Sequence, residues 1–285
     1  MPSHLQHPYL GRGVVLTSKH QKLHLIAPPF ENELSIEMVE LDLDTDQFGT
    51  FSGEKPRTLS QLETAVAKAR LGMTHAGVSL GIASEGAIGA DFLIPFLNSD
   101  IEILVFIDSE SDLIISESYR SFDITAVSRT IMHGANLDEL LLSADFPRHG
   151  LIVRTETNGK SKSIKGINEI NSLYEAIDSL MRESNNGQVT VESDLRAHFS
   201  PSRRQNISRA AELLAARVAS LCPSCNTPGW GRTSFTRGLS CSSCGLENIE
   251  AIRSEILGCN RCDFTAPGNL IAASLDPARC IECNP

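Results

Sequence analysis

Short apolar blocks alternate along the first 193 residues with segments whose apolar positions recur at helical spacing. The clearest helix is 60–73, where apolar side chains fall on one face and Ser60 with Glu63 fits a capping box at its start. A helix at 19–27 is expected to end before the Pro28-Pro29 pair, because proline cannot continue a helix. The full pattern predicts strands over 13–17, 34–41, 78–83, 101–107, 112–119, 150–154 and 188–191, and further helices over 137–142 and 169–182.

The order of these elements predicts the fold class. Strands and helices that alternate in this way form an α/β domain with a mixed sheet, and ligands of such domains bind in the loops that follow the strands. We therefore expect a mixed-sheet α/β domain over 1–193, a basic loop and connecting helix over 194–220, and a cysteine-rich region over 221–285.

Charge divides the chain at similar boundaries. The formal net charge is -10, and the first 193 residues contribute 15 basic and 27 acidic side chains to it. Residues 194–217 carry five arginines against two acids, so a short basic segment precedes the cysteine-rich region. An acidic chain of this kind is a poor candidate for a general nucleic-acid coat or for binding an anionic membrane.

The first residues lack the pattern of an export signal, and no apolar run reaches the roughly 18 residues of a transmembrane helix. We therefore expect a cytoplasmic protein with no membrane partner. In the reducing cytoplasm, cysteine pairs are more often metal ligands than disulfides.

All eight cysteines lie after residue 221 and form four CxxC pairs, separated by 15, 14 and 17 residues. Each pair presents two thiolates on one tight turn, and two pairs make the tetrahedral sulfur shell that Zn²⁺ prefers. The region is therefore predicted to be a double zinc ribbon with two Zn²⁺ ions. Consecutive pairing of the four knuckles is the simplest arrangement, and nested pairing, with the two middle knuckles on one ion, is the alternative. The predicted ligands are Cys222, Cys225, Cys241, Cys244, Cys259, Cys262, Cys280 and Cys283.

Both zinc ions are predicted to be structural. All eight ligands come from the protein, so no coordination position is left open for water, and the segment is too short and polar to fold on a core alone. A thioredoxin-like redox role requires a CxxC at a helix start in a βαβ context, which this region lacks. Nucleic-acid binding is the alternative, with phosphate contacts from Arg203, Arg204, Arg209 and Arg217, although residues 218–285 are slightly acidic.

Three polar stretches of the α/β part are candidates for a ligand site. The first is 17–22, between the first strand and the first helix, where Thr17, Ser18, Lys19 and Lys22 join the amides of a helix N-terminus. Hydroxyls, amides and lysines together suit a phosphate group. The same residues are equally typical of a capped helix start with exposed lysines.

The second stretch, 42–54, combines four carboxylates with hydroxyls and two glycines, and clustered carboxylates suit Mg²⁺. The third, 83–89, leaves a buried-type strand and carries Glu85, which at a strand end could hold a metal or orient water. Both stretches can also be ordinary solvated turns. Further along, Arg203 and Arg204 could reach a phosphate in this site, or form ion pairs that dock the zinc region.

The whole chain resembles a bacterial family catalogued only as a domain of unknown function. The resemblance is specific and nearly full-length, but it implies no established activity. It is carried by the segments GRGVVLTSKHQK, LDTDQFGTFSGE, GIASEGAIG, KGI at 165–167, DLRAHFSPSRR at 194–204 and the terminal CxxCNP.

A remoter resemblance covers residues 12–108. The order of elements there is similar to that of house-cleaning nucleoside-triphosphate pyrophosphatases of the inosine-triphosphate and Maf type. Those enzymes begin with a strand and a T-x-N-x-x-K phosphate motif, which Thr17 and Lys22 match, whereas Lys19 replaces the asparagine.

The helix of those enzymes contains A-x-x-KA, matched here by AVAKA with Lys68, and Glu85-Gly86 takes the place of their acidic strand end. The resemblance implies that Glu54 and Glu85 hold Mg²⁺ and that Lys22 and Lys68 contact phosphates. A motif for recognising the base is not evident in the chain.

Two functions follow as hypotheses. The first is a Mg²⁺-dependent nucleotide or phosphate-ester hydrolase, which requires Lys22, Glu54, Glu85 and Arg203 to converge on one pocket. The second is a non-catalytic zinc-ribbon binding or scaffold protein whose acidic domain recognises a protein or a nucleic acid. In the first hypothesis the catalytic residues are Glu54, Glu85, Lys22 and Lys68, and the substrate-binding residues are Thr17, Ser18, Lys19, Arg203 and Arg204.

Overall fold

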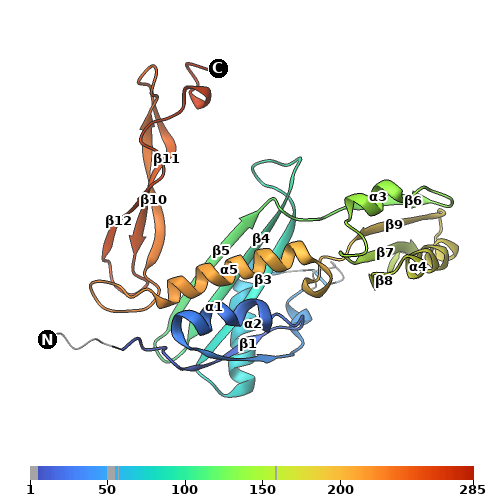
Figure 1. Cartoon of the computed structure of the whole chain (residues 1–285), viewed down its shortest axis with the longest axis horizontal. Helices are drawn as coiled ribbons and strands as arrows, with labels where there is room; N and C mark the ends of the chain where they lie inside the picture. The colour runs from blue at the N-terminus through green and yellow to red at the C-terminus, as the bar shows by residue number, and fades with distance from the viewer. Residues whose placement is uncertain (1–5, 50–54, 57, 158) are drawn as a thin grey trace.

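The computed structural model of the chain describes residues 6–49, 55, 56, 58–157 and 159–285. Three parts can be followed in Figure 1, and each is built on its own sheet. We call them the central lobe, which holds a five-stranded sheet, the second lobe, which holds a four-stranded sheet, and the arm, which holds a three-stranded sheet.

The central sheet is mixed, as the sequence predicts. Its strands are β1 (Gly13–Thr17), β2 (Glu37–Leu41), β3 (Leu80–Ala90), β4 (Asn98–Asp108) and β5 (Leu113–Ser121), in the order β2-β1-β3-β4-β5. β1 runs parallel to both β2 and β3, whereas β3, β4 and β5 form an antiparallel meander. Because β1 ends at Thr17, opposite Ala83, the second half of β3 continues beyond the end of β1.

Three helices cover the two faces of this sheet. α1 (Leu23–Leu34) and α5 (Pro201–Ala219) pack on one face, over a core that includes Leu16, Phe106 and Leu214. α2 (Gln61–Ala76) packs on the opposite face. The predicted capping box at the start of α2 is present, since the Ser60 hydroxyl accepts from the Glu63 amide and the Glu63 carboxylate accepts from the Ser60 amide.

The prediction for the first helix was wrong at both ends. α1 starts at Leu23 and contains both Pro28 and Pro29, where the sequence pattern places the end of the helix. The prolines remove backbone donors from α1, but Ile26 and Phe30 on the same helix are fully buried in the core. Burial of this apolar face offsets the lost hydrogen bonds, because tertiary packing outweighs local propensity.

The second lobe lies beyond the far end of the central sheet (Figure 1). It contains β6 (Ser128–Met132), α3 (Asp138–Ser143), β7 (Leu151–Thr157), β8 (Lys160–Ile167), α4 (Ile170–Glu183) and β9 (Gln188–Ser193). Its sheet is antiparallel in the order β6-β9-β7-β8 and has a separate core, which includes Leu151, Leu173 and Val191. The pattern of apolar residues predicts β7, β9 and both helices but misses β6 and β8, whose side chains are mostly exposed and polar.

A hydrogen-bonded chain joins the second lobe to the start of α5. His149 Nδ1 lies 3.1 Å from Asp145 Oδ2, and His149 Nε2 lies 3.0 Å from Ser202 Oγ. The Ser202 amide also donates to His149 Nε2, over 3.2 Å. The buried imidazole therefore caps the first turn of α5, whose own N-cap residue Ser200 makes no side-chain cap.

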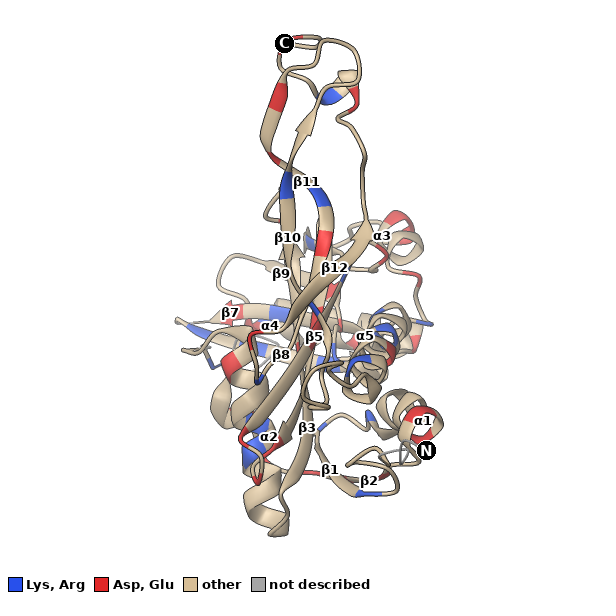
Figure 2. Cartoon of the chain, turned by 90° about the vertical axis from the view of Figure 1, so that its left-hand side faces the viewer, with Lys and Arg blue, Asp and Glu red and all other residues tan. Residues whose placement is uncertain are grey.

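The arm follows α5; its base contacts the central lobe, and its tip stands away from both lobes (Figure 1). Its strands are β10 (Gly231–Ser240), β11 (Glu247–Gly258) and β12 (Thr265–Leu270), paired in an antiparallel sheet of that order. Basic and acidic residues are interspersed along it, without a continuous basic stripe on the face that Figure 2 shows. Among the described residues, no helix combines the length and the apolar character needed to cross a membrane.

Candidate functional site

The eight cysteines form two clusters of four in the arm. Cys222, Cys225, Cys259 and Cys262 make the cluster next to the central lobe, and Cys241, Cys244, Cys280 and Cys283 make the distal cluster. Sulfur pairs between the two knuckles are 3.5 and 3.7 Å apart in the first cluster and 3.6 and 3.8 Å apart in the second. Four sulfurs at about 2.3 Å from a central Zn²⁺ in a tetrahedron stand about 3.8 Å apart, so both clusters fit zinc.

The pairing of the knuckles is neither consecutive nor nested, so both predictions for it were wrong. The first knuckle joins the third, and the second joins the fourth. The reason is the long antiparallel hairpin of β10 and β11, which carries the chain from the base of the arm to its tip and back. The second knuckle lies at the tip, the third returns to the base, and the segment after β12 brings the fourth to the tip again.

The knuckles have the local geometry of metal-binding turns. Asn226 follows the first knuckle with φ +56° and Gly245 follows the second with φ +75°, the left-handed conformation that asparagine and glycine adopt most readily. Backbone amides also point at the sulfurs, with Ser243 N 3.4 Å from Cys241 Sγ and Arg261 N 3.3 Å from Cys259 Sγ. Such donors stabilise thiolates, the form that binds metal.

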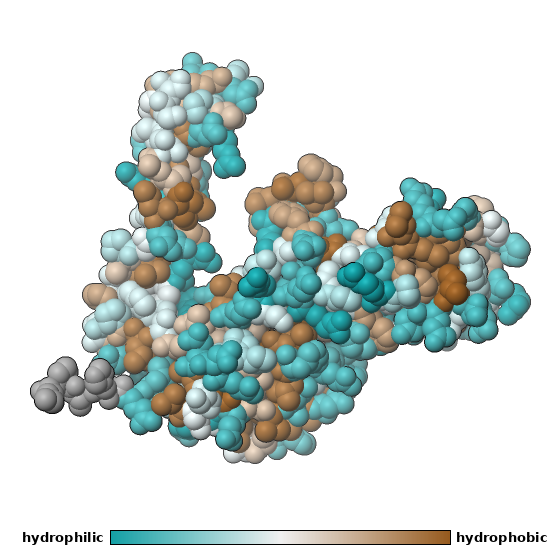
Figure 3. Space-filling view, in the orientation of Figure 1, coloured by the Kyte–Doolittle hydropathy of each residue, from teal (hydrophilic) through white to brown (hydrophobic). Residues whose placement is uncertain are grey.

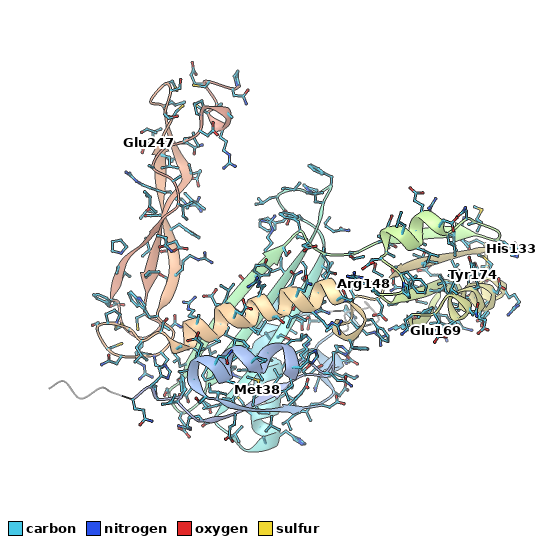
Figure 4. All side chains as sticks on the ribbon, in the orientation of Figure 1. Met38, His133, Arg148, Glu169, Tyr174 and Glu247 are labelled. Atoms are coloured by element: carbon cyan, nitrogen blue, oxygen red, sulfur yellow. The ribbon has the colours of Figure 1, made fainter. Side chains whose placement is uncertain are left out.

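The two clusters differ in their surroundings. The base cluster is fixed to the central lobe, because Arg217 of α5 donates to the Gly229 carbonyl over 3.2 Å and to Glu117 of β5 over 2.7 Å. Arg261, inside the third knuckle, donates to the Ser111 carbonyl. The distal cluster lies at the far end of the arm, near the labelled Glu247 in Figure 4. With four protein ligands each, both clusters have the composition of structural zinc sites.

Apart from the two cysteine clusters, a group of polar side chains lies at the carboxyl ends of β1 and β2, where ligands of open α/β sheets bind. The residues after β1 and β2 meet here with the part of β3 that extends past β1. We call this cavity the polar pocket. It is lined by Thr17, Ser18, Lys19, His20, Lys22, Thr45, Asp46, Gly49, Lys68, Ser84, Glu85 and Arg203.

Besides Lys19, three cations line the polar pocket, one just before α1 and two from the helices α2 and α5. Lys22 precedes α1 and is 5% exposed, Arg203 of α5 is 2% exposed, and the Lys68 side chain of α2 is 14% exposed. Lys68 Nζ lies 2.5 Å from Glu85 Oε2, and Arg203 Nε donates to Glu102 Oε1 over 2.6 Å. The hydrogen bond of Lys22 goes to the Ser84 hydroxyl, 2.9 Å away, instead of to a carboxylate.

The electrostatic surroundings shift the ionisation of several of these groups. Burial lowers the pKa of Lys22 to about 8, and the nearby Arg203 adds to this effect. Burial likewise lowers the pKa of His20 to about 3, so its imidazole is neutral at pH 7. Below the pocket, burial and then Glu102 raise the pKa of Asp100 to about 7. Such shifts are typical of functional sites, although structural ion pairs produce them too.

The structure brings most of the predicted site residues together. Thr17, Ser18, Lys19, Lys22, Lys68, Glu85 and Arg203 all line the polar pocket. Glu54 lies outside the described residues. Arg204, in contrast, lies beside Leu25 and Arg209 in a different surface hollow, because neighbouring residues of α5 face different directions.

Other details of the predicted site differ. Glu85 lies inside β3, paired with Ile103 of β4, and not at the end of a strand. The Thr17 hydroxyl packs against α2, so closely that a Cβ on Gly72 would stand 1.9 Å from Thr17 Oγ1. Lys19 forms ion pairs with Asp44 and Asp46 of the acidic stretch.

The N-terminus of α1 is not available to a phosphate. Glu40 of β2 accepts from the Lys22 amide over 2.8 Å and from the Leu23 amide over 3.3 Å. A carboxylate of the protein thus occupies the donors that the sequence assigns to a ligand. An anion in the pocket would therefore be bound chiefly by side chains.

Sequence reasoning included Ser84 in the stretch 83–89 but gave it no role, and it missed Asp100 and Glu102. Asp100 and Glu102 are fully buried under α5, where Asn206 donates to Asp100 Oδ2 over 2.9 Å. Asp100 Oδ1 and Glu102 Oε2 accept no hydrogen bond in the described part of the chain. The signal was present, because two carboxylates within the apolar run of β4 must be paired or functional when that strand is buried.

A larger cleft of about 630 Å³ lies between the central lobe and the second lobe. Ile88 and Gly89 of β3 form one wall, and Ile152 and Arg154 of β7 contribute to the other. Leu195 lines this cleft, and its carbonyl accepts from Arg203 Nη1 over 2.7 Å. Arg203 therefore contacts a residue that lines the cleft and itself lines the polar pocket.

The fold and the clusters define an α/β protein with a polar pocket at the strand ends and a two-site cysteine arm of the zinc-ribbon type. The model of a domain of unknown function, DUF6671, matches residues 68–285, and the chain belongs to that family. A comparison with curated proteins finds no match.

Proposed function

We propose that the protein hydrolyses phosphate esters or nucleotides, with the phosphoryl group bound in the polar pocket. The observation that carries this proposal is the convergence of Lys22, Lys68 and Arg203 on one small buried pocket. Glu85 pairs with Lys68 and Glu102 with Arg203, whereas the hydrogen bond of the buried Lys22 goes to a hydroxyl, so an anionic ligand would balance the charge of Lys22. The order of elements over residues 12–108, similar to nucleoside-triphosphate pyrophosphatases, supports the same reaction class as an analogy of fold.

The rest of the substrate would lie in the cleft between the lobes. β3 contributes to both cavities, with Ser84 and Glu85 in the polar pocket and Ile88 and Gly89 in the cleft. The cleft volume of about 630 Å³ is in the range of small-molecule sites. Two ion pairs, Arg154 with Glu192 and Arg196 with Asp194, border it and offer polar contacts to a sugar or a base.

Mg²⁺ would enter this site with the substrate, since it takes few protein ligands when phosphate oxygens are available. Its chemistry there would be neutralisation of phosphoryl charge. Among the described residues, only the two cysteine clusters gather three or more metal ligands. Glu85 is held by Lys68 instead, so the protein's own contribution would be the positioning of phosphate by its cations.

A panel of nucleotides, pyrophosphate and simple phosphate esters tests the proposal in the presence of Mg²⁺ or Mn²⁺, with release of phosphate or pyrophosphate as the readout. Lys68→Met and Arg203→Met should reduce turnover at least tenfold, because each removes a cation from the pocket. Lys160→Met, on the exposed edge of the second lobe, is the matched control. Absence of turnover, together with no ligand-dependent rise in melting temperature, would exclude the proposal.

A second candidate function is binding of a protein partner without catalysis. It is favoured by the loop between β3 and β4, where Phe92, Leu93 and Phe96 are 67–86% exposed and form an apolar knob visible in Figure 3. The loop is fixed, because Asp91 accepts from the Leu93 amide and pairs with Arg120. Exposed apolar groups on a fixed loop are typical of interaction sites.

Phe96→Ser in an affinity-tagged chain distinguishes the two candidates. A binding protein would lose its partner in a pull-down while the polar pocket stays intact. A hydrolase would keep its turnover, because Phe96 lies outside the pocket.

A further inference from the structure

Lys22 differs from the other two cations of the polar pocket. Lys68 is hydrogen-bonded to Glu85 and Arg203 to Glu102, whereas the hydrogen bond of Lys22 goes to the Ser84 hydroxyl. The Lys22 Nζ–Ser84 Oγ distance is 2.9 Å, and both residues are only 5% exposed. Lys22 Nζ donates to Ser84 Oγ in this contact. When the amine is neutral the same contact can reverse, with the hydroxyl donating to Nζ, and the pair then has the groups of a nucleophile and its base.

The fold holds this pair rigidly from two sides. Lys22 is fixed by its backbone, since the Glu40 carboxylate accepts from its amide. Ser84 lies in β3, at the first residue past the last pair with β1, and its backbone pairs with Leu104 of β4. The alternation of side chains along β3 places Ser84 on the face covered by α1 and α5, whereas Glu85 points to the α2 face.

We propose that Ser84 is a nucleophile of the pocket, with Lys22 as its general base, and that it forms a covalent phosphoserine intermediate. This inference rests on the proposed function for the phosphoryl group as the electrophile. It goes further, because hydrolysis by direct attack of water would need no protein nucleophile.

The step balances within the pocket. Ser84 Oγ bonds to phosphorus while the bond from phosphorus to the leaving group breaks, and the hydroxyl proton passes to Lys22 Nζ. The leaving group takes that proton from Lys22. Water then attacks the phosphoserine, Lys22 accepts a proton from the water, and Ser84 Oγ recovers it as phosphate is released.

The charges around the pair suit this role. Lys22 can act as a base only when neutral, and burial in the pocket, with Arg203 and Lys68 nearby, favours the neutral amine. Glu102 and Glu85 oppose this effect but are each held by another cation. Arg203 and Lys68, each ion-paired with a carboxylate, line the same pocket and place positive charge beside the phosphoryl oxygens.

An alkyl fluorophosphonate probe tests the inference without a known substrate. The probe should label the full-length protein at Ser84, with loss of fluoride, and tryptic peptide mapping by mass spectrometry identifies the residue. Ser84→Ala should abolish labelling, and Lys22→Met should slow it at least tenfold. Ser161→Ala and Lys160→Met, both on β8, are the matched controls and should label at the wild-type rate.

The wild-type chain provides the decisive result, so the test does not depend on the folding of a variant. Labelling at another residue, or no labelling at all, overturns the inference. If nucleotides are hydrolysed but Ser84 is not labelled, the proposed function stands with water as the nucleophile and the covalent step falls. If Ser84 is labelled but no phosphate substrate is turned over, the dyad stands and the proposed function falls.

Discussion

Arg203 of α5 lies directly on Gly86 of β3. A Cβ built on Gly86 would stand 2.4 Å from Arg203 Nη2 and 2.4 Å from Glu102 Oε1. The absence of a side chain at Gly86 leaves space beside the sheet for the buried ion pair between Arg203 and Glu102. Position 86 is therefore a glycine because a side chain there would collide with Arg203 and Glu102, and not because the backbone adopts a conformation that favours glycine.

Gly86→Ala should therefore displace Arg203 from the polar pocket. Overpacking of this kind costs about 1–3 kcal/mol of unfolding free energy, and loss of the guanidinium position should weaken any phosphate binding at least tenfold. Urea denaturation and titration with inorganic phosphate measure the two effects. Gly89→Ala on the same strand is the control, because a Cβ there meets no atom within 4 Å. Equal behaviour of the two variants would contradict the assigned contact.

Interleaved zinc ligation predicts metal contents that other pairings do not. Cys222→Ser with Cys259→Ser removes two ligands of the same cluster, so this double variant should retain one zinc ion per chain. Cys222→Ser with Cys241→Ser damages both clusters and should retain none. Metal analysis of the purified variants gives the counts. Consecutive pairing would reverse the two results.

The buried Lys22 should make stability depend on pH. Its pKa is about 8 in the folded protein against 10.5 in the unfolded chain, so between these values the unfolded chain binds more protons. The contribution of Lys22 to the free energy of unfolding of the protein therefore rises as the pH increases from about 8 to 10.5. Below pH 8 the folded protein carries the buried charge at a cost of roughly 3 kcal/mol, taking 1.36 kcal/mol per pKa unit.

Lys22→Met removes that cost and should stabilise the protein at pH 7. Because wild-type Lys22 has lost most of its proton in the folded state by pH 9.5, the gain there should be about half as large. Urea denaturation at the two pH values measures it, with Lys160→Met as the control for general charge. A gain that is the same at both pH values would show that the Lys22 charge is not the cause.

His149→Ala should loosen the joint between the lobes. The variant removes both contacts of Ser202 with the imidazole, although the Ser202 hydroxyl still accepts from the Thr125 amide. Loss of two hydrogen bonds costs about 1–3 kcal/mol in total. We expect a lower melting temperature and faster proteolysis between β9 and α5. His133→Ala, at the outer end of the second lobe in Figure 4, is the control. A His149→Ala chain as resistant as wild type would indicate that His149 contributes no constraint.

The sequence predicted those features that depend on local chemistry. The capping box depends only on the four residues from Ser60 to Glu63, and the geometry of each CxxC knuckle depends only on the residues of its own turn. Both are found in the structure. Lys22, Lys68 and Glu85 line one pocket in the structure. The sequence grouped them only through the resemblance to nucleoside-triphosphate pyrophosphatases, because Lys68 lies on a helix and Glu85 lies inside a strand.

Features set by distant contacts were not predictable in this way. The zinc pairing depends on the length and direction of the β10–β11 hairpin, which the gaps between cysteines do not encode. The continuation of α1 through Pro28 depends on the core that Phe30 enters. The occupation of the α1 N-terminus by Glu40 depends on the register of β2 beside β1.

The interleaved knuckles make the two clusters complete at different points along the chain. The base cluster has all its ligands within residues 222–262, whereas the distal cluster also needs Cys280 and Cys283. Metal could therefore fix the foot of the arm to the central lobe without the last knuckle, while the tip could not close. A chain truncated between residues 262 and 280 would carry one zinc ion and an open hairpin tip with two unliganded thiols.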